Sequence, residues 1–224
     1  MKGYSVRLVR LIFGLFLFAL GSFLTIQANI GLASWEAFSI GIANLTNQTY
    51  GNILIISGLF ILVIDVLLKE KIGFGTILNT ILIGVFVDMI QAFDIIPQMN
   101  NFFSGVFMLL LGQVSICVGS YFYIGASMGC GPRDALMVAL GKRLPNVPIG
   151  IVRGAIEGTV LLIGWLLGAK VGIGTVISVF GISFILETTF KLLHFDVTNV
   201  EHESVVDTVK NFQLLAGKKS ESSK

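Results

Sequence analysis

The chain has 224 residues, of which 54% are hydrophobic and 12% are charged. Its mean hydropathy of +0.89 excludes an ordinary soluble globular domain, in which about 25% of residues are charged. The formal net charge of +2 is too small for a nucleic-acid-binding surface, so nucleic acid is not an expected partner. The composition therefore predicts an integral membrane protein whose main partner is the lipid bilayer.

Six stretches are long and apolar enough to cross a bilayer, which takes about 20 apolar residues at helical rise. They cover residues 9–29, 51–68, 74–93, 103–126, 149–168 and 172–193. Two amphipathic stretches, 34–46 and 132–143, reach only about 18 Å each as helices and are too short to span. We expect one all-α membrane domain over residues 1–193.

The end of the chain differs in composition from the rest. Residues 194–224 are mostly polar and charged. Val205, Val209 and Phe212 recur among charged residues at helical spacing, which predicts one short amphipathic helix in a cytosolic tail.

An internal repeat relates the two halves of the chain. A shift of 98 residues places GSFLTIQANIG, from Gly21, on GSYFYIGASMG, from Gly119. A shift of 99 residues then places KIGFGT, from Lys71, on KVGIGT, from Lys170. Chance alignment of apolar segments matches leucine with isoleucine, whereas here glycines and a Gly-x-Gly-Thr recur in the same order. The chain is therefore interpreted as two copies of one unit.

The predicted architecture is six transmembrane helices in two inverted three-helix repeats, over about 9–93 and 103–193, each with a short helix after its first span. Three spans is an odd number, so the second copy enters the membrane upside down. With the N-terminus inside, the basic residues lie on the cytosolic side apart from Lys170, as the positive-inside rule requires. We expect a multi-pass plasma-membrane protein with both termini cytosolic.

A glycine-rich turn precedes each short helix. The turns are GLASWEAF, from Gly31, and GCGPRDAL, which contains Gly129 and Gly131. These glycines are expected to let the chain turn back. Ser34 is expected to cap the first short helix and Pro132 to occupy the first turn of the second.

Each short helix carries an acid in its first turn, Glu36 in one and Asp134 in the other. In one arrangement the helices are re-entrant, and the acids lie deep on opposite sides of one central cavity. In the other the helices are interfacial, and the acids cap their own first turns near the headgroups. We take the re-entrant arrangement as the prediction to test.

Ionisable residues inside apolar spans are costly and need an explanation. Asp65 precedes Lys69 by four residues and Glu187 precedes Lys191 by four. Each spacing predicts an ion pair on one helix face.

Arg153 and Glu157 lie deeper in the fifth predicted span, beside a stripe formed by Gly150, Gly154 and Gly158. Small residues of this kind allow another helix to approach closely. Two interpretations stay open: a structural pair that locks two helices, and a polar element of a substrate path.

Enzyme motifs do not fit this chain. Gly125 to Gly129 match G-x-S-x-G around Ser127, but that motif needs a strand-turn-helix elbow and a histidine base. The two histidines, His194 and His202, lie at the far cytosolic end and in the tail. Metal, P-loop and dinucleotide motifs are absent from the sequence. We expect no catalytic residue, no metal and no cofactor.

The two cysteines, Cys117 and Cys130, have neither metal-binding nor disulfide spacing. Both lie in or beside apolar segments, so they are interpreted as small packing residues.

The chain also resembles a known family. The residues that carry the resemblance are the Trp35-Glu36 pair, Gly51, and the run Gly73, Gly75, Thr76, Asn79, Gly84 and Asp88. Together they resemble the YczE/YyaS/YitT group of bacterial membrane proteins, over nearly the whole chain up to about residue 193. Where that family commonly has Pro-Trp-Asp, this chain has Ser34-Trp35-Glu36 and Pro132-Arg133-Asp134. The resemblance implies a multi-pass plasma-membrane protein and supplies no substrate.

The leading hypothesis is a small-molecule transporter or facilitator with a site between the two inverted units. The candidate substrate-binding residues are Trp35, Glu36, Arg133, Asp134, Arg153 and Glu157. The second hypothesis is a non-transporting scaffold or regulatory partner of another membrane complex. A homo-oligomer is compatible with both.

Overall fold

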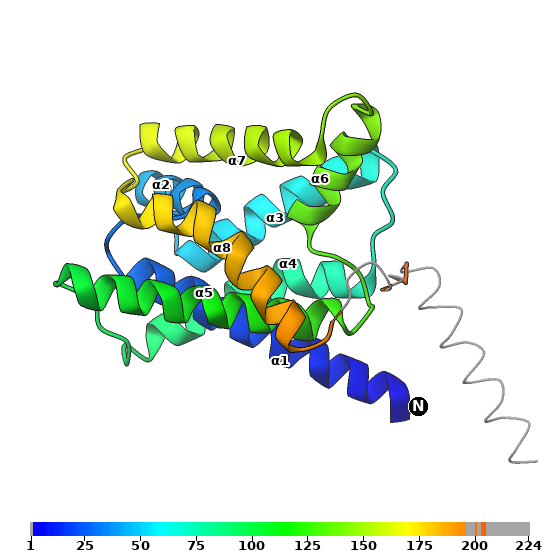
Figure 1. Ribbon diagram of the computed structural model, residues 1–224, viewed down its shortest axis with the longest axis horizontal. Coiled ribbons are helices and arrows are strands. Elements are labelled where there is room, and N and C mark those ends of the chain that lie inside the picture. The colour runs from blue at the N-terminus through cyan, green and yellow to red at the C-terminus, as the bar shows by residue number, and fades with distance from the viewer. Residues whose placement is uncertain (1, 196–199, 201–202, 205–224) are drawn as a thin grey trace, which may run out of the picture.

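The computed structural model describes residues 2–195, 200, 203 and 204, and the regular secondary structure of these residues is entirely helical (Figure 1). The first half contains α1 (Lys2–Gln27), α2 (Ser34–Thr46), α3 (Tyr50–Leu67) and α4 (Phe74–Ala92). The second half contains α5 (Phe102–Ile124), α6 (Pro132–Arg143), α7 (Ile149–Leu166) and α8 (Ile173–Leu192). Both halves thus have the same order of one long, one short and two long helices. The predicted tail helix lies outside the described residues.

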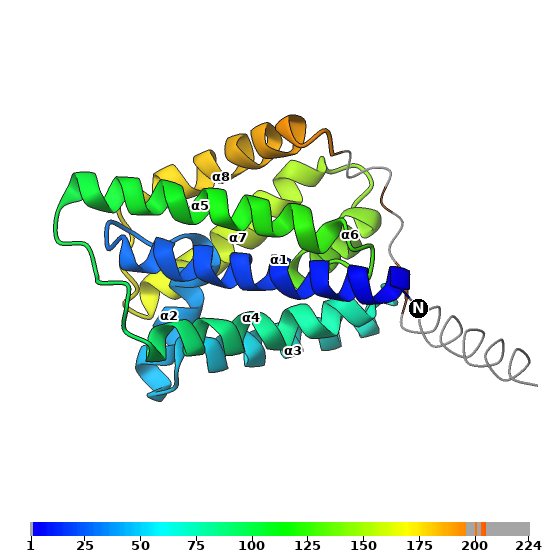
Figure 2. The same ribbon diagram turned by 90° about the horizontal axis from the view of Figure 1, so that it is seen from below.

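The contact between α1 and α5 forms the centre of the bundle, and glycines set its closeness. A Cβ atom added to Gly14 would lie 2.8 Å from the carbonyl oxygen of Gly119, and one added to Gly21 would lie 2.5 Å from that of Gly112. The two backbones therefore touch, as in other small-residue contacts between membrane helices. Because the earlier glycine of α1 meets the later glycine of α5, the helices run antiparallel (Figure 2).

The other helices surround this pair. α4 packs on α1 and α8 packs on α5, while each short helix packs on a long helix of the opposite half, α2 on α7 and α6 on α3. The apolar core gathers along α1, α3, α4 and the end of α5. The short helices thus join the two halves of the chain.

The halves differ in how their last two helices pack. α3 packs closely on α4, since a Cβ atom on Gly84 would lie 2.5 Å from the carbonyl oxygen of Gly51. α7 and α8 make no comparable contact within the described residues, and they diverge from the turn that joins them (Figure 1). Cβ atoms added to Gly150, Gly154 or Gly158 of α7 would meet no described neighbour within 4 Å. In the described part of the chain, no helix packs on this stripe, where the sequence suggested that one could approach.

Among the described residues, five helices are long and apolar enough to cross a membrane: α1 from Tyr4, α3, α4, α5 and α8. Large apolar side chains such as Phe103 and Phe180 are 80% and 76% exposed on them, as lipid-facing residues are. The chain is therefore an integral membrane protein. The sixth predicted span, α7, is not among the five, so the six-span count stays a prediction.

The bounds of the two short helices confirm the predicted stretches, and one capping prediction is wrong. Pro132 occupies the first turn of α6 as expected. Ser34 does not cap α2, because the helix begins at Ser34 itself and the capping position belongs to Ala33, which has no side-chain acceptor.

The ion pairs predicted inside the spans have different outcomes. Lys191 binds Glu187 at 2.7 Å, as predicted. The predicted pair of Asp65 and Lys69 is wrong: α3 ends at Leu67, and Lys69 follows with φ +57°. The chain has left the helix before Lys69, so the helical spacing of four residues does not apply there.

Candidate functional site

The first glycine turn lies against the start of α8. Gly31 has φ +130°, and a Cβ atom there would lie 2.8 Å from the backbone nitrogen of Gly172. The N–H of Gly174 donates to the carbonyl of Ile30 at 2.9 Å, and the Thr175 hydroxyl donates to that of Leu32 at 2.7 Å. Glycine is required here both for the positive φ and for the close approach.

The second glycine turn lies against the start of α4 in the same way. Gly129 has φ +128°, and a Cβ atom there would lie 2.5 Å from the Thr76 hydroxyl oxygen. The N–H of Gly75 donates to the carbonyl of Met128 at 2.7 Å. At Gly131 an added Cβ atom would come no closer than 3.4 Å to a neighbour, so this glycine is under less constraint.

Each turn thus packs on the Gly-x-Gly-Thr of the opposite half. Sequence reasoning found both motifs but did not pair them. The available signal was that each motif occurs once in each repeat, in the same relative position. The turns therefore interlock the halves and hold the first residues of α2 and α6 in place.

The first turns of α2 and α6 meet through Trp35 and Arg133. The guanidinium carbon of Arg133 lies 4.4 Å from the centroid of the Trp35 ring, a cation–π contact. These residues occupy equivalent positions in the repeat, 98 residues apart. The structure therefore brings together two of the predicted site residues, one from each half.

Glu36, the residue after Trp35, belongs to a cluster of buried polar side chains. Its carboxylate accepts a hydrogen bond from Ser22 of α1 at 3.3 Å, and the Ser22 hydroxyl lies 3.0 Å from the Tyr50 hydroxyl of α3. Glu36 is 9% exposed. Three helices of the first half thus surround one acid.

Asp134 has different surroundings. Its carboxylate accepts a hydrogen bond from the hydroxyl of Tyr123 in α5 at 3.2 Å. Tyr123 is buried, whereas Asp134 is exposed. The expected equivalence of Asp134 and Glu36 in burial is therefore not found, although each binds a hydroxyl from the first long helix of its own half.

Arg153 and Glu157 form an ion pair on one face of α7, with 2.9 Å between the Arg153 Nε and a Glu157 carboxylate oxygen. Both partners belong to the same helix, and the glycine stripe beside them is uncovered. The ion pair lies within one helix, and its role in locking two helices together stays a prediction. Its role in a substrate path stays a prediction.

A cavity of about 290 Å³ lies at one end of the bundle, beside the first glycine turn. It is lined by Ile26, Asn29, Gly31, Leu32, Ile40, Asn44, Gln98, Gly168, Ala169 and Lys170. The Lys170 ammonium donates to the side-chain oxygen of Asn29 at 2.9 Å. Of the predicted site residues only Gly31 lines this cavity, so a cavity between the two acids stays a prediction.

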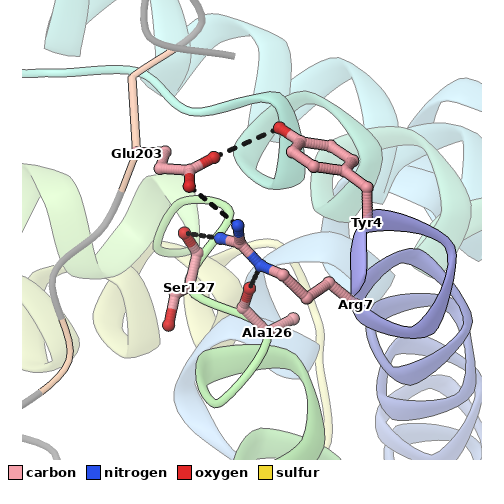
Figure 3. Close-up of polar contacts among 5 residues, drawn as sticks. All are labelled: Tyr4, Arg7, Ala126, Ser127 and Glu203. Carbon is pink, nitrogen blue, oxygen red and sulfur yellow. Dashed lines mark hydrogen bonds and ion pairs between the residues drawn. The ribbon is translucent and has the colours of Figure 1, made fainter. Parts of the chain in front are cut away.

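At the other end, Arg7 of α1 holds the second glycine turn and a residue of the tail (Figure 3). Its guanidinium donates to the carbonyls of Ala126 at 2.8 Å and Ser127 at 2.9 Å. The same group binds the Glu203 carboxylate at 2.7 Å, which also accepts from the Tyr4 hydroxyl at 3.1 Å. Sequence reasoning used Arg7 only as a topological charge, and no local pattern linked it to Glu203.

Comparison with known proteins agrees with this description. Residues 5–191 match the model of the "Family of unknown function (DUF6198)". An uncharacterized protein of Haemophilus influenzae is 32% identical over 183 residues, which cover 82% of this chain and 83% of the relative.

Two relatives come from Bacillus subtilis. The uncharacterized membrane protein YczE is 32% identical over 74% of this chain and 76% of its own length. The uncharacterized protein YyaS is 23% identical over 74% of this chain and 83% of its own length. No solved structure matches. The chain therefore belongs to the DUF6198 family and to the YczE/YyaS-like group that its sequence resembles.

Proposed function

We propose that this protein is a small-molecule transporter or facilitator of the plasma membrane, with its site between two inverted three-span units. The observation that carries the proposal is the contact of Trp35 with Arg133. The contact joins equivalent positions of the two short helices. Trp35 is followed in the sequence by Glu36, and Arg133 by Asp134. Ionisable groups gathered inside an apolar membrane bundle are a typical mark of a substrate or ion path.

The glycine contacts between α1 and α5 support the inverted arrangement. Gly14 and Gly112 are equivalent in the repeat, and so are Gly21 and Gly119. Gly14 touches Gly119 while Gly21 touches Gly112, so each contact is repeated with the roles exchanged. Reciprocal contact of this kind is what a two-fold axis between two units produces. If α7 crosses the membrane like its equivalent, α3, this two-fold arrangement gives six spans with both termini cytosolic.

The difference between the halves supports a transport cycle. α3 is packed on α4, and the carboxylate of Asp88 accepts from the N–H of Gly51 at 2.8 Å where these helices meet. The equivalent helices, α7 and α8, are apart. Inverted units that exchange such arrangements would open a site to each side of the membrane in turn.

The test is uptake by purified protein in proteoliposomes, screened with labelled amino acids, organic acids and amines. We expect wild type to accumulate at least one class. Glu36→Gln and Glu157→Gln are expected to reduce this uptake, because they remove the two acids proposed to face the path. Glu187→Gln is the matched control, since Glu187 is exposed and pairs within its own helix.

Two results would count against this function. Uptake that is unchanged in Glu36→Gln and Glu157→Gln would remove these acids from the mechanism. Absence of uptake for every class, together with a stoichiometric protein partner in a detergent pull-down, would favour the scaffold function instead.

A further inference from the structure

The carboxyl group of Asp65 is fully buried, and no described residue forms a hydrogen bond with it. Asp65 lies in the last turn of α3 and is 0% exposed. Neither of its carboxylate oxygens has a partner among the described residues. Every other acidic side chain in the described part of the chain is free of such buried, unpartnered oxygens. The site proposed above makes no use of this group.

An ionised carboxylate is not stable in these surroundings. Buried charges in proteins are paired, hydrogen-bonded or neutralised by a change of protonation. Asp65 belongs to none of the ion pairs between described residues, and Lys69, the partner expected from sequence, follows the end of α3. Burying a neutral carboxylic acid at the same place has a much smaller desolvation penalty.

The basic residues of α6 nearest to this end of α3 are already engaged. Lys142 binds the carboxylate of Glu70 at 2.7 Å, and Arg143 donates to the carbonyl of Leu68 at 2.8 Å. Glu70 approaches Asp65 through its own backbone, since its N–H donates to the Asp65 carbonyl at 2.9 Å. These contacts leave the Asp65 side chain without a cation from α6.

The elements packed on α3 are α2, α4 and α6, and none of their other ionisable groups bonds to Asp65. Those groups, with the ones in the adjoining turns, are Glu36, Lys71, Asp88, Cys130, Arg133 and Asp134. Glu70, just past the end of α3, adds negative charge near Asp65, and a further negative charge at Asp65 is disfavoured by it. The surroundings as a whole thus favour the protonated form.

The repeat places Asp65 at the contact between the halves. Its equivalent, 99 residues later, is Gly164 of α7. A Cβ atom on Gly164 would lie 2.5 Å from the backbone of Ala37 and Phe38, so α7 lies directly on α2 at this point. α3 packs on α6 as α7 packs on α2. One half has bare backbone contact where the other has a carboxyl group.

We propose that Asp65 is a proton-binding site at the contact between α3 and α6. With the helices packed, the side chain is a carboxylic acid. When α3 and α6 separate, water reaches the group, and it releases the proton to water and becomes a carboxylate. This second step rests on the transport function proposed above, whereas protonation in the packed state does not.

The experiment is infrared spectroscopy of the full chain in lipid nanodiscs, with aspartate labelled by ¹³C at the side-chain carboxyl. At neutral pH we expect a band from a protonated aspartic acid in wild type. The band should be lost in Asp65→Asn and kept in Asp94→Asn and Asp88→Asn, which remove aspartates outside this contact. A wild-type spectrum without the band, or a band that persists in Asp65→Asn, would overturn the proposal.

Thermal unfolding gives a second readout. A group that binds its proton more tightly in the folded state contributes stability at low pH and loses it as pH rises. The melting temperature of wild type should therefore fall relative to that of Asp65→Asn as pH increases. The same dependence of melting temperature on pH in both proteins would contradict protonation of Asp65. If Asp65→Asn does not fold, the two control variants still test the assignment, because the band of the protonated acid must persist in both of them.

A band in wild type without any uptake would support the proton site and contradict the transport function. Uptake without a band would support transport and contradict the proton site.

Discussion

The guanidinium of Arg133 lies over the ring of Trp35, 4.4 Å from its centroid, although each residue belongs to a different half of the chain. The two positions are equivalent in the repeat. The contact therefore joins the two halves of the chain at their short helices. Its contribution to stability can be measured as a coupling energy.

A double-mutant cycle on Trp35→Ala and Arg133→Gln should give a coupling of about 1 kcal/mol in thermal unfolding, the size of a partly desolvated cation–π contact. The control replaces Trp165, which is 58% exposed on α7, by alanine in the same Arg133→Gln background. Additive effects are expected for that control. Additive effects for Trp35 and Arg133 would mean that their contact does not couple the halves.

Alanine at Gly21 should destabilise the protein by about 1–3 kcal/mol, because overpacking a close contact forces helices apart. The new Cβ atom would lie 2.5 Å from the carbonyl oxygen of Gly112. Gly154→Ala is the matched control, since nothing lies within 4 Å of its added Cβ atom. There alanine should be neutral or stabilise α7 by up to about 1 kcal/mol through helix propensity. Thermal unfolding in detergent compares the two, and equal losses would argue against the α1–α5 contact.

The helices and their order could be predicted from the sequence because local signals determine them. Apolar length separates long helices from short ones, and the two short helices begin and end at the predicted residues. The glycines matched by the repeat correctly predicted turns that need glycine, since Gly31 and Gly129 both have positive φ values.

The contacts between halves could not be predicted in this way. The packing of Gly31 on the start of α8 joins segments about 140 residues apart, as the bond from Lys170 to Asn29 does with a separation of 141. No local pattern encodes such a pair. The ion pair assigned to Asp65 failed for a related reason, because helical spacing was applied beyond Leu67, where α3 ends.

Alkylation of Cys130 should be slow near neutral pH. Burial raises the pKa of this thiol to about 11, and the negative charge of Asp134 acts in the same direction. Only the thiolate reacts, so in a Cys117→Ser background the rate should rise about tenfold per pH unit between about pH 7 and 10.

Removing the charge of Asp134 should lower the pKa of Cys130. Asp134→Asn is therefore expected to speed alkylation at a fixed pH, while Asp94→Asn leaves it unchanged. A rate that levels off well below pH 10 in the parent protein would show that the thiol ionises more easily than its surroundings imply.

Arg7→Gln should destabilise the protein more than Glu203→Gln. The side chains of the pair are 28% and 25% exposed, so loss of the charge on Glu203 is expected to cost only about 0.5–1 kcal/mol. Arg7 also binds the carbonyls of Ala126 and Ser127, and leaving them without a donor adds about 1–3 kcal/mol. Thermal unfolding measures both, and equal losses would mean that Arg7 acts only through Glu203.

Two contacts between distant residues determine which positions lie on the same side of the membrane. The ion pair of Lys142 with Glu70 places these residues at one end of the bundle, and the bond of Lys170 to Asn29 places those two together at the other.

In a background without Cys117 and Cys130, single cysteines at Glu70 and Lys142 should resist an impermeant maleimide added to intact cells. Single cysteines at Lys170 and Asp94 should react, since the six-span arrangement puts both outside. Lysed cells serve as the control, in which all four positions should react. Labelling of position 70 from outside would exclude six spans with a cytosolic N-terminus, because the two spans expected before it return the chain to the side on which it began.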